Sequence, residues 1–211
     1  MSTFRIAVFA SGEGSNFQAL AEAANTDTLG GAKIALLVCD KPSAPVVRRA
    51  EQLGIPAYVF KPKDYDSREA YEREIVMRLE ELQVDLIVLA GYMRLLTPVI
   101  VHQYRGRLIN IHPSLLPAFP GKDAIGQALA YGVKLSGVTV HFVDEGMDTG
   151  PIIAQRAIDI VSGETAESFA QAVHGIEREL YPTVVSWFAQ GFVRLEGREV
   201  TVTQADTKDY R

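Results

Sequence analysis

The sequence has 211 residues, of which 47% are hydrophobic and 22% are charged, a composition typical of a globular protein. Twenty-one Lys and Arg residues against 26 Asp and Glu residues give a formal net charge of -5. Because no long basic run accompanies this charge, we expect neither a nucleic acid nor an anionic membrane as a partner. A chain of this length buries about 70% of its unfolded surface, so its core needs neither disulfide bonds nor a structural metal.

The single cysteine, Cys39, lies inside an apolar run and has no second cysteine with which to form a disulfide bond. We predict a packing role for its side chain and a reducing compartment for the protein. No apolar stretch approaches the roughly 20 residues that span a bilayer, and the N-terminal apolar run is too short for a signal peptide. The sequence therefore predicts a cytoplasmic protein that forms a single domain over residues 1–211.

Short aliphatic runs alternate with helical patterns in the first half of the chain. The predicted strands cover residues 5–10, 33–39, 57–60, 86–90 and 108–111. Apolar residues at helical spacing predict helices after Ser15 and after Ser67, and Thr97 followed by Pro98 is typical of a helix start. This alternation predicts an α/β fold with a mostly parallel central sheet and helices on both faces.

The second half of the chain changes character. Runs at 137–143 and 152–160 predict two neighbouring strands across an acidic loop, as an antiparallel addition to the sheet. An apolar stripe after Thr165 predicts a long helix, which Pro182 should kink or restart. A hairpin around Glu196-Gly197 and a frayed polar end complete the prediction.

The turn Ser11-Gly12-Glu13-Gly14-Ser15-Asn16 lies between a predicted strand and a predicted helix. Glycines let the backbone approach a ligand, and a helix N-terminus offers unpaired N–H groups to a phosphate. The spacing is neither the dinucleotide G-x-G-x-x-G nor a P-loop. The alternative is an ordinary glycine turn with Ser15 as the helix N-cap.

A second motif, Asn110-Ile111-His112-Pro113, ends a predicted central strand, where open parallel sheets bind their ligands. If both residues lie on the strand, Asn110 and His112 share one face, and an amide with an imidazole suits a developing oxyanion and a proton transfer. The alternative for His112 is a buried structural histidine.

Three carboxylates, those of Asp144, Glu145 and Asp148, fall within five positions of the loop between the last two sheet strands. A solvated turn is one interpretation, and calcium is a weak one because the EF-hand spacing is missing. His141 on the preceding strand either faces the same cleft or caps an edge. Residues 90–98 form another loop, which either lines an apolar pocket or belongs to the core.

These four segments, in this order and spacing, resemble the family of folate-dependent phosphoribosylglycinamide formyltransferases over essentially the whole chain. Asn-x-His-Pro-Ser-Leu-Leu-Pro at 110–117, Gly-Val-Thr-Val-His at 137–141 and Asp-x-Gly-Pro at 148–151 are the signature of the wider folate formyltransferase group. The Ser-Gly-x-Gly-Ser-Asn loop at 11–16 narrows the resemblance to this family. The chain departs from many members at 122–126, where Lys-Asp-Ala-Ile-Gly replaces a His-containing stretch.

The resemblance implies a Rossmann-like formyltransferase fold, 10-formyltetrahydrofolate as co-substrate, small-molecule partners and no required metal, in a monomer or a homodimer. Residues 1–105 would form the phosphate-binding half, and residues 106–211 the folate-binding and catalytic half. The implied ribonucleotide-binding residues are Gly14, Ser15, Asn16 and Glu177. The implied folate-binding residues are Arg68, Met93, Arg94, Leu95, Leu96, Asn110, Val143, Asp144 and Asp148.

The resemblance makes Asn110, His112 and Asp148 the catalytic residues. The ribonucleotide amine would attack the formyl carbon on folate N10, Asn110 and a protonated His112 would stabilise the resulting oxyanion, and Asp148 would relay the proton directly or through a water.

Three alternative functions stay open at this point. Formyltetrahydrofolate hydrolase has the same Asn, His and Asp but usually carries an additional N-terminal domain, whereas this chain starts at its first strand. Methionyl-tRNA formyltransferase needs a basic C-terminal domain, which a net charge of -5 disfavours. A non-catalytic folate- or nucleotide-binding protein is the third.

Overall fold

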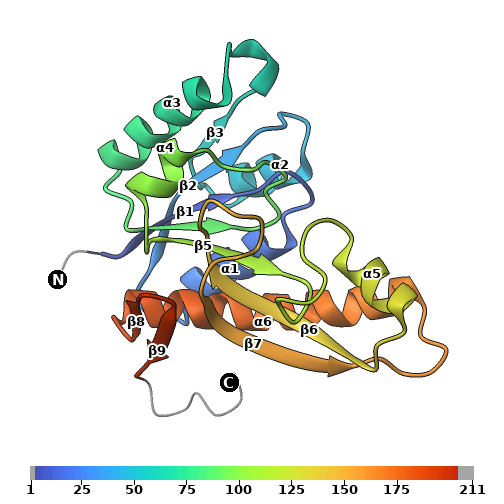
Figure 1. The fold of residues 1–211 in the computed structure, drawn as a ribbon. Coiled ribbons are helices and arrows are strands. Elements are labelled where there is room, and N and C mark those ends of the chain that lie inside the picture. Colours follow the sequence, from blue (N-terminus) through green and yellow to red (C-terminus); the bar gives the residue numbers. More distant parts are fainter. Residues whose placement is uncertain (1–2, 204–211) are drawn as a thin grey trace.

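The apolar runs form a seven-stranded sheet in the computed structural model, which describes residues 3–203 (Figure 1). The strands are β1 Arg5–Phe9, β2 Lys33–Cys39, β3 Ala57–Val59, β4 Leu86–Leu89, β5 Leu108–His112, β6 Leu135–Phe142 and β7 Ile152–Asp159. Their order is β3-β2-β1-β4-β5-β6-β7. The first five are parallel, whereas β6 and β7 are antiparallel to their neighbours. The predicted mostly parallel sheet with antiparallel strands in the C-terminal half is confirmed.

Each central strand contributes side chains to two cores, because successive residues point to opposite faces. In β1, Ile6 and Val8 pack into one core, and Ala7 and Phe9 pack into the other. Cys39 is fully buried, and burial raises the pKa of its thiol, so the predicted packing role is confirmed.

Helices cover both faces of the sheet. They are α1 Ser15–Asn25, α2 Pro45–Gln52, α3 Arg68–Glu81, α4 Pro98–Gln103, α5 Ala124–Tyr131 and α6 Ala166–Ala189, with a 3-10 turn η1 Pro62–Asp64. The apolar sides of α1, α2 and α6 pack into one core, and those of α3 and α4 pack into the other (Figure 1). The side chains of Ser67 and Thr97 cap α3 and α4, and the helix start at Thr97 is as the sequence predicts.

Two features differ from the sequence prediction. Pro182 lies inside α6, which runs unbroken through it, so the prediction of a restart is wrong. Buried Tyr181 and Val184 fasten the helix to the core on both sides of the proline, and this packing outweighs one missing N–H donor. The helices α2 and α5 fall in segments for which we predict no element.

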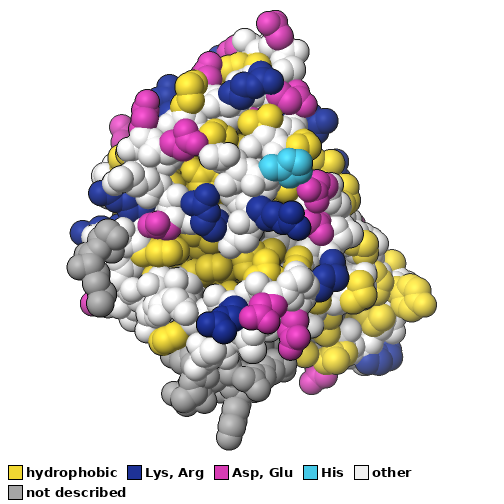
Figure 2. All heavy atoms as spheres, turned by 60° about the vertical axis from the view of Figure 1, so that its left-hand side comes forward, with side chains coloured by type: hydrophobic (Ala, Val, Ile, Leu, Met, Phe, Trp, Pro, Cys, Tyr) yellow, Lys and Arg dark blue, Asp and Glu magenta, His cyan; other side chains and the backbone are white. Residues whose placement is uncertain are grey.

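The predicted terminal hairpin is present as β8 Val193–Glu196 and β9 Glu199–Val202. The predicted frayed end, residues 204–211, lies outside the described residues. Within residues 3–203, no helix combines the length and apolar composition that a bilayer crossing requires. On the face in Figure 2, Lys and Arg side chains are interspersed with Asp and Glu side chains around an apolar strip.

Candidate active site

The loop after β1 turns the chain into α1 through Gly14. Gly14 has φ +76° and occupies the N-cap position, so the alternative of Ser15 as N-cap is wrong. A Cβ at this position would lie 2.5 Å from Cγ2 of Val46, which leaves room for glycine alone. Ser15 is therefore the exposed first residue of α1, where unpaired N–H groups and the positive end of the helix dipole attract an anion.

The predicted ribonucleotide residues are brought together across 161 positions of sequence. Asn16 Nδ2 donates to Glu177 Oε2 at 3.2 Å, and both side chains are buried. The same oxygen lies 3.1 Å from Nδ1 of His174, and this hydrogen bond raises the pKa of His174. Among the described residues, Asn16 Oδ1 is buried without a hydrogen-bond partner.

A buried carboxylate ties this loop to the loop after β4. Asp40, at the end of β2, accepts from Ser11 Oγ at 2.5 Å and from Arg94 Nε at 2.7 Å. Ser11 Oγ in turn accepts from the Met93 N–H at 3.0 Å. Because β1, β2 and β4 are parallel neighbours, their carboxyl ends meet at one edge of the sheet. Asp40 joins the loops that follow β1 and β4 at this edge.

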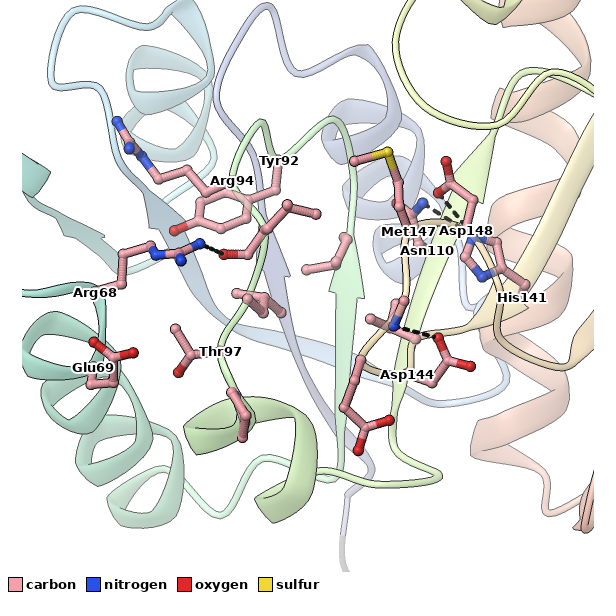
Figure 3. A pocket seen from close by; sticks show the side chains of 17 residues that line it. Arg68, Glu69, Tyr92, Arg94, Thr97, Asn110, His141, Asp144, Met147 and Asp148 are labelled. Carbon is pink, nitrogen blue, oxygen red and sulfur yellow. Dashed lines mark hydrogen bonds and ion pairs between the residues drawn. The ribbon is translucent and has the colours of Figure 1, made fainter.

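Beside this junction lies a cavity of about 370 Å³, seen in Figure 3. Eight of the nine predicted folate residues line it: Arg68, Arg94, Leu95, Leu96, Asn110, Val143, Asp144 and Asp148. Met93 is not among the lining residues, and its side chain is 68% exposed. Leu95 is also largely exposed, whereas Tyr92 and Leu96 pack against the second core, so the loop belongs partly to the cavity wall and partly to the core.

Tyr92 and Thr97, from the same 90–98 loop, also line the cavity, although the resemblance assigns neither of them a ligand contact. Thr97 is held by the fully buried carboxylate of Glu72, which accepts from its N–H at 2.9 Å and from its Oγ1 at 2.6 Å. A buried carboxylate with these donors fixes the start of α4 and one wall of the cavity.

Asn110 and His141 face each other at the opposite wall, at paired positions of β5 and β6 (Figure 3). His141 Nδ1 lies 2.7 Å from the Phe142 carbonyl oxygen, which only accepts, so Nδ1 carries a proton. Burial lowers the pKa of His141, and the neutral ring leaves Nε2 as an acceptor for Asn110 Nδ2 at 3.2 Å. His141 therefore faces the cleft, which was one of the two possibilities.

His112 is 5% exposed and is not among the residues that line the cavity. Its Nε2 donates to the Phe119 carbonyl oxygen at 2.9 Å, which turns Nδ1 toward Asp148 Oδ2 at 3.5 Å. Asp148 Oδ2 also accepts from the Gly121 N–H at 2.7 Å, and Oδ1 lies 3.7 Å from His141 Nε2. One carboxylate thus sits between two imidazoles, and the three predicted catalytic side chains are brought together.

The three carboxylates of the acidic loop point to different partners. Asp144 Oδ1 accepts from Thr149 Oγ1 at 2.6 Å, and Glu145 Oε1 lies 3.0 Å from His102 Nε2. Within residues 3–203, no group of three or more His, Cys, Asp or Glu side chains is arranged to hold a metal ion.

Tyr181 of α6 holds two central strands of the sheet in place beside the site. Its fully buried hydroxyl donates to the Leu89 carbonyl oxygen at 2.7 Å and lies 3.2 Å from that of Ile109. Burial raises the pKa of Tyr181, so the phenol stays a donor and links the end of β4 to β5 at Ile109, next to Asn110.

Taken together, an amide, a carboxylate and two imidazoles stand beside a cavity at the carboxyl edge of the sheet, where the N-terminus of α1 also follows β1. This set suits an enzyme that stabilises a developing oxyanion and moves a proton, as in acyl-group transfer.

Comparison with known proteins narrows this class. Residues 4–185 match the formyl transferase family. The phosphoribosylglycinamide formyltransferase of Bacillus subtilis is 53% identical over 181 residues, which cover 86% of this chain and 92% of that protein.

Solved structures agree with this match. Glycinamide ribonucleotide transformylase 1 from Geobacillus kaustophilus is 56% identical with a TM-score of 0.87, covering 89% of this chain and all of that one. The corresponding enzyme from Symbiobacterium toebii is 40% identical with a TM-score of 0.92, covering 96% of this chain and 95% of that one. The chain belongs to the formyl transferase family, and it is an enzyme, a one-carbon transferase.

Proposed function

We propose that the protein transfers the formyl group of 10-formyltetrahydrofolate to the amine of 5'-phosphoribosylglycinamide. The products are formylglycinamide ribonucleotide and tetrahydrofolate, in de novo purine synthesis. The observation that carries the proposal is the arrangement of an anion-binding helix end and a ligand-sized cavity beside Asn110, His112 and Asp148. The names of the relatives from Bacillus and Geobacillus support it.

The ribonucleotide phosphate binds at the N-terminus of α1. Gly14 allows the close approach, and the N–H groups of Ser15 and Asn16 with the Ser15 hydroxyl contact the phosphate. Glu177 accepts from the ribose or glycinamide end, and this places the amine on the side of the catalytic residues.

The folate binds in the cavity of about 370 Å³, which falls within the usual size range of small-molecule pockets. Arg94, Leu95 and Leu96, with Met93 beside them, hold one side of the pterin ring, and the loop from Val143 to Asp148 holds the other. Arg68 lies at the outer end of the cavity, where its guanidinium contacts the polar tail of the cofactor.

In the reaction the amine nitrogen forms a bond to the formyl carbon, and the formyl oxygen becomes an oxyanion. Asn110 Nδ2, which lines the cavity, stabilises this charge directly, and the imidazolium of His112, whose Nδ1 faces Asp148, adds its positive charge beside the site. Asp148 relays the proton lost by the amine, directly or through a water, to N10 of the folate, while the oxyanion returns to a carbonyl and the bond between N10 and the formyl carbon breaks. His141 keeps the Asn110 amide oriented.

We further propose that residues 1–211 form one formyltransferase domain in the cytoplasm, acting as a monomer or a homodimer on small molecules alone. The phosphate site belongs to residues 1–105 and the catalytic residues belong to residues 106–211. Glu177 completes the phosphate site from the second half, and Arg68, Arg94, Leu95 and Leu96 complete the folate cavity from the first half.

The test is a transfer assay with purified protein, in which tetrahydrofolate release is followed with and without the ribonucleotide. Release that depends on the ribonucleotide supports the proposal. Equal release without it would identify a hydrolase instead, and no release from either mixture would leave a binding protein.

A further inference from the structure

Three side chains lie in a row across neighbouring strands. In the registers of β5, β6 and β7, His112 is opposite Thr139, and Thr139 is opposite Gln155. Residues directly opposite each other project from the same face of a sheet, so the His112 imidazole has a hydroxyl and an amide beside it. Thr139 is completely buried, and neither Thr139 nor Gln155 lines the cavity.

The Thr139 hydroxyl is fully engaged by hydrogen bonds. It donates to the Ser114 carbonyl oxygen at 2.7 Å and accepts from the Leu116 N–H at 3.0 Å and from Gln155 Nε2 at 2.9 Å. These bonds use its one donor and both acceptor positions. Gln155 Nε2 also donates to the Leu116 carbonyl oxygen at 3.0 Å, so two side chains hold residues 114–116 at three backbone atoms.

A few residues later, the backbone of the same segment contacts the catalytic side chains. Ser114 Oγ donates to the Ala118 carbonyl oxygen at 2.6 Å, which closes the turn. The next carbonyl, that of Phe119, accepts from His112 Nε2 at 2.9 Å. The Gly121 N–H donates to Asp148 Oδ2 at 2.7 Å. One segment therefore orients both His112 and Asp148.

We propose that Thr139 and Gln155 are positioning residues for the reaction, which hold residues 114–121 so that Phe119 and Gly121 keep His112 and Asp148 in their working orientation. The inference rests on the proposed function. Replacing the Thr139 hydroxyl by a methyl group leaves the Ser114 carbonyl and the Leu116 N–H without that partner in a dry site, and the segment shifts to restore the lost bonds.

The experiment compares four variants of the full chain. Thr139→Val removes the hydroxyl at nearly constant volume, and Thr139→Ser restores it. Gln155→Met removes only the two hydrogen bonds that the Gln155 side-chain amide donates. Because this position is half-buried, the variant provides the test if Thr139→Val fails to fold. Ser136→Ala is the matched control, because Ser136 lies on the same strand with a buried hydroxyl that has no partner among the described residues.

We expect Thr139→Val and Gln155→Met to lower kcat by at least about tenfold with both KM values within about twofold, because a small misplacement of catalytic groups affects the transition state most. Thr139→Ser recovers kcat to within about threefold of the original, and Ser136→Ala matches the original protein. Unchanged kcat in Thr139→Val, or equal losses in Thr139→Val and Thr139→Ser, would overturn the proposal.

A second readout does not depend on turnover. In ¹H–¹⁵N NMR spectra, the hydrogen-bonded Nε2 proton of His112 should shift or disappear in Thr139→Val and persist in Thr139→Ser and Ser136→Ala. A His112 signal that is unchanged in Thr139→Val contradicts the positioning role. If the original protein fails to transfer the formyl group while this signal responds as expected, the proposed function fails and the positioning of His112 by Thr139 stands.

Discussion

The Nε2 atom of His141 lies 3.2 Å from Nδ2 of Asn110, and this contact decides which way the Asn110 amide points. Because the Phe142 carbonyl occupies Nδ1 of His141, the neutral ring presents only an acceptor to Asn110. One Nδ2–H is donated to His141, and the second is left for a ligand in the cavity that Asn110 lines. An oxyanion-stabilising donor held before the substrate arrives contributes more than one that must rotate during the reaction.

The protonation state of His141 can be measured directly. We expect NMR titration to give His141 a pKa below its ordinary value of 6.5, because burial disfavours the imidazolium. Asp148→Asn should lower this pKa further, since it removes a carboxylate that favours the charged ring. Asp159→Asn, at the far end of β7, is the control and should leave it unchanged. A His141 pKa that rises in Asp148→Asn contradicts the described contact.

Removing a catalytic group should affect the rate far more than the fold. His112→Ala and Asp148→Ala should each lower kcat by at least about a hundredfold, as expected for the loss of a proton-transfer or charge-stabilising group. Circular dichroism should show the same helix content in both variants. Turnover within a few-fold of the original protein would remove that residue from the catalytic set.

Ser15 tests the phosphate site. Ser15→Ala should raise the KM for the ribonucleotide about three- to tenfold and leave kcat nearly unchanged, because a phosphate contact is made equally in the ground state and the transition state. The KM for the folate serves as the internal control and should not move. An unaltered ribonucleotide KM would show that the Ser15 side chain does not contact the phosphate.

Gly14 and Gly54 provide a matched pair for the shape of the first loop. Both have positive φ, +76° and +64°, but a Cβ at Gly14 would collide with Val46, whereas one at Gly54 meets nothing within 4 Å. Gly54→Ala should lower the free energy of unfolding by about 1–2 kcal/mol from backbone strain alone. Gly14→Ala should cost about 1–3 kcal/mol more from overpacking.

The two glycine variants should also differ in binding. Gly14→Ala should raise the ribonucleotide KM, and Gly54→Ala should not, because only the first loop receives the phosphate. Urea denaturation and steady-state kinetics give the two quantities. Equal unfolding free energies for the two variants would refute the close contact between Gly14 and Val46.

The sequence predicts the sheet well because its strands are continuous apolar runs between polar or glycine boundaries. The Leu86–Leu89 strand and the stripe of α6 are unambiguous for this reason. Helix α2 is missed because only Val46 and Ala50 of its eight residues are buried, and its cap residue, Ala44, makes no side-chain hydrogen bond. Pro182 misleads because tertiary packing, which a local pattern does not contain, holds the helix on both sides.

The candidate site, too, is predictable from the sequence only in part. Asn110 and His112 are predictable because they share a strand face, and Asp148 follows from its motif. The groups that orient them are not predictable, since they are the backbone atoms of Phe119 and Gly121 and the partners that strand register supplies. Asp40 and Glu72 carry no motif, and only the fold reveals them as buried carboxylates that hold the loops.

The most direct measurement follows the formyl carbon itself. We would prepare 10-formyltetrahydrofolate labelled with ¹³C in the formyl group, add the protein and the ribonucleotide, and record ¹³C NMR spectra. We expect the label to appear in the formamide of the ribonucleotide, and only when protein and ribonucleotide are both present. Label recovered as free formate, or remaining on the folate, would contradict this expectation.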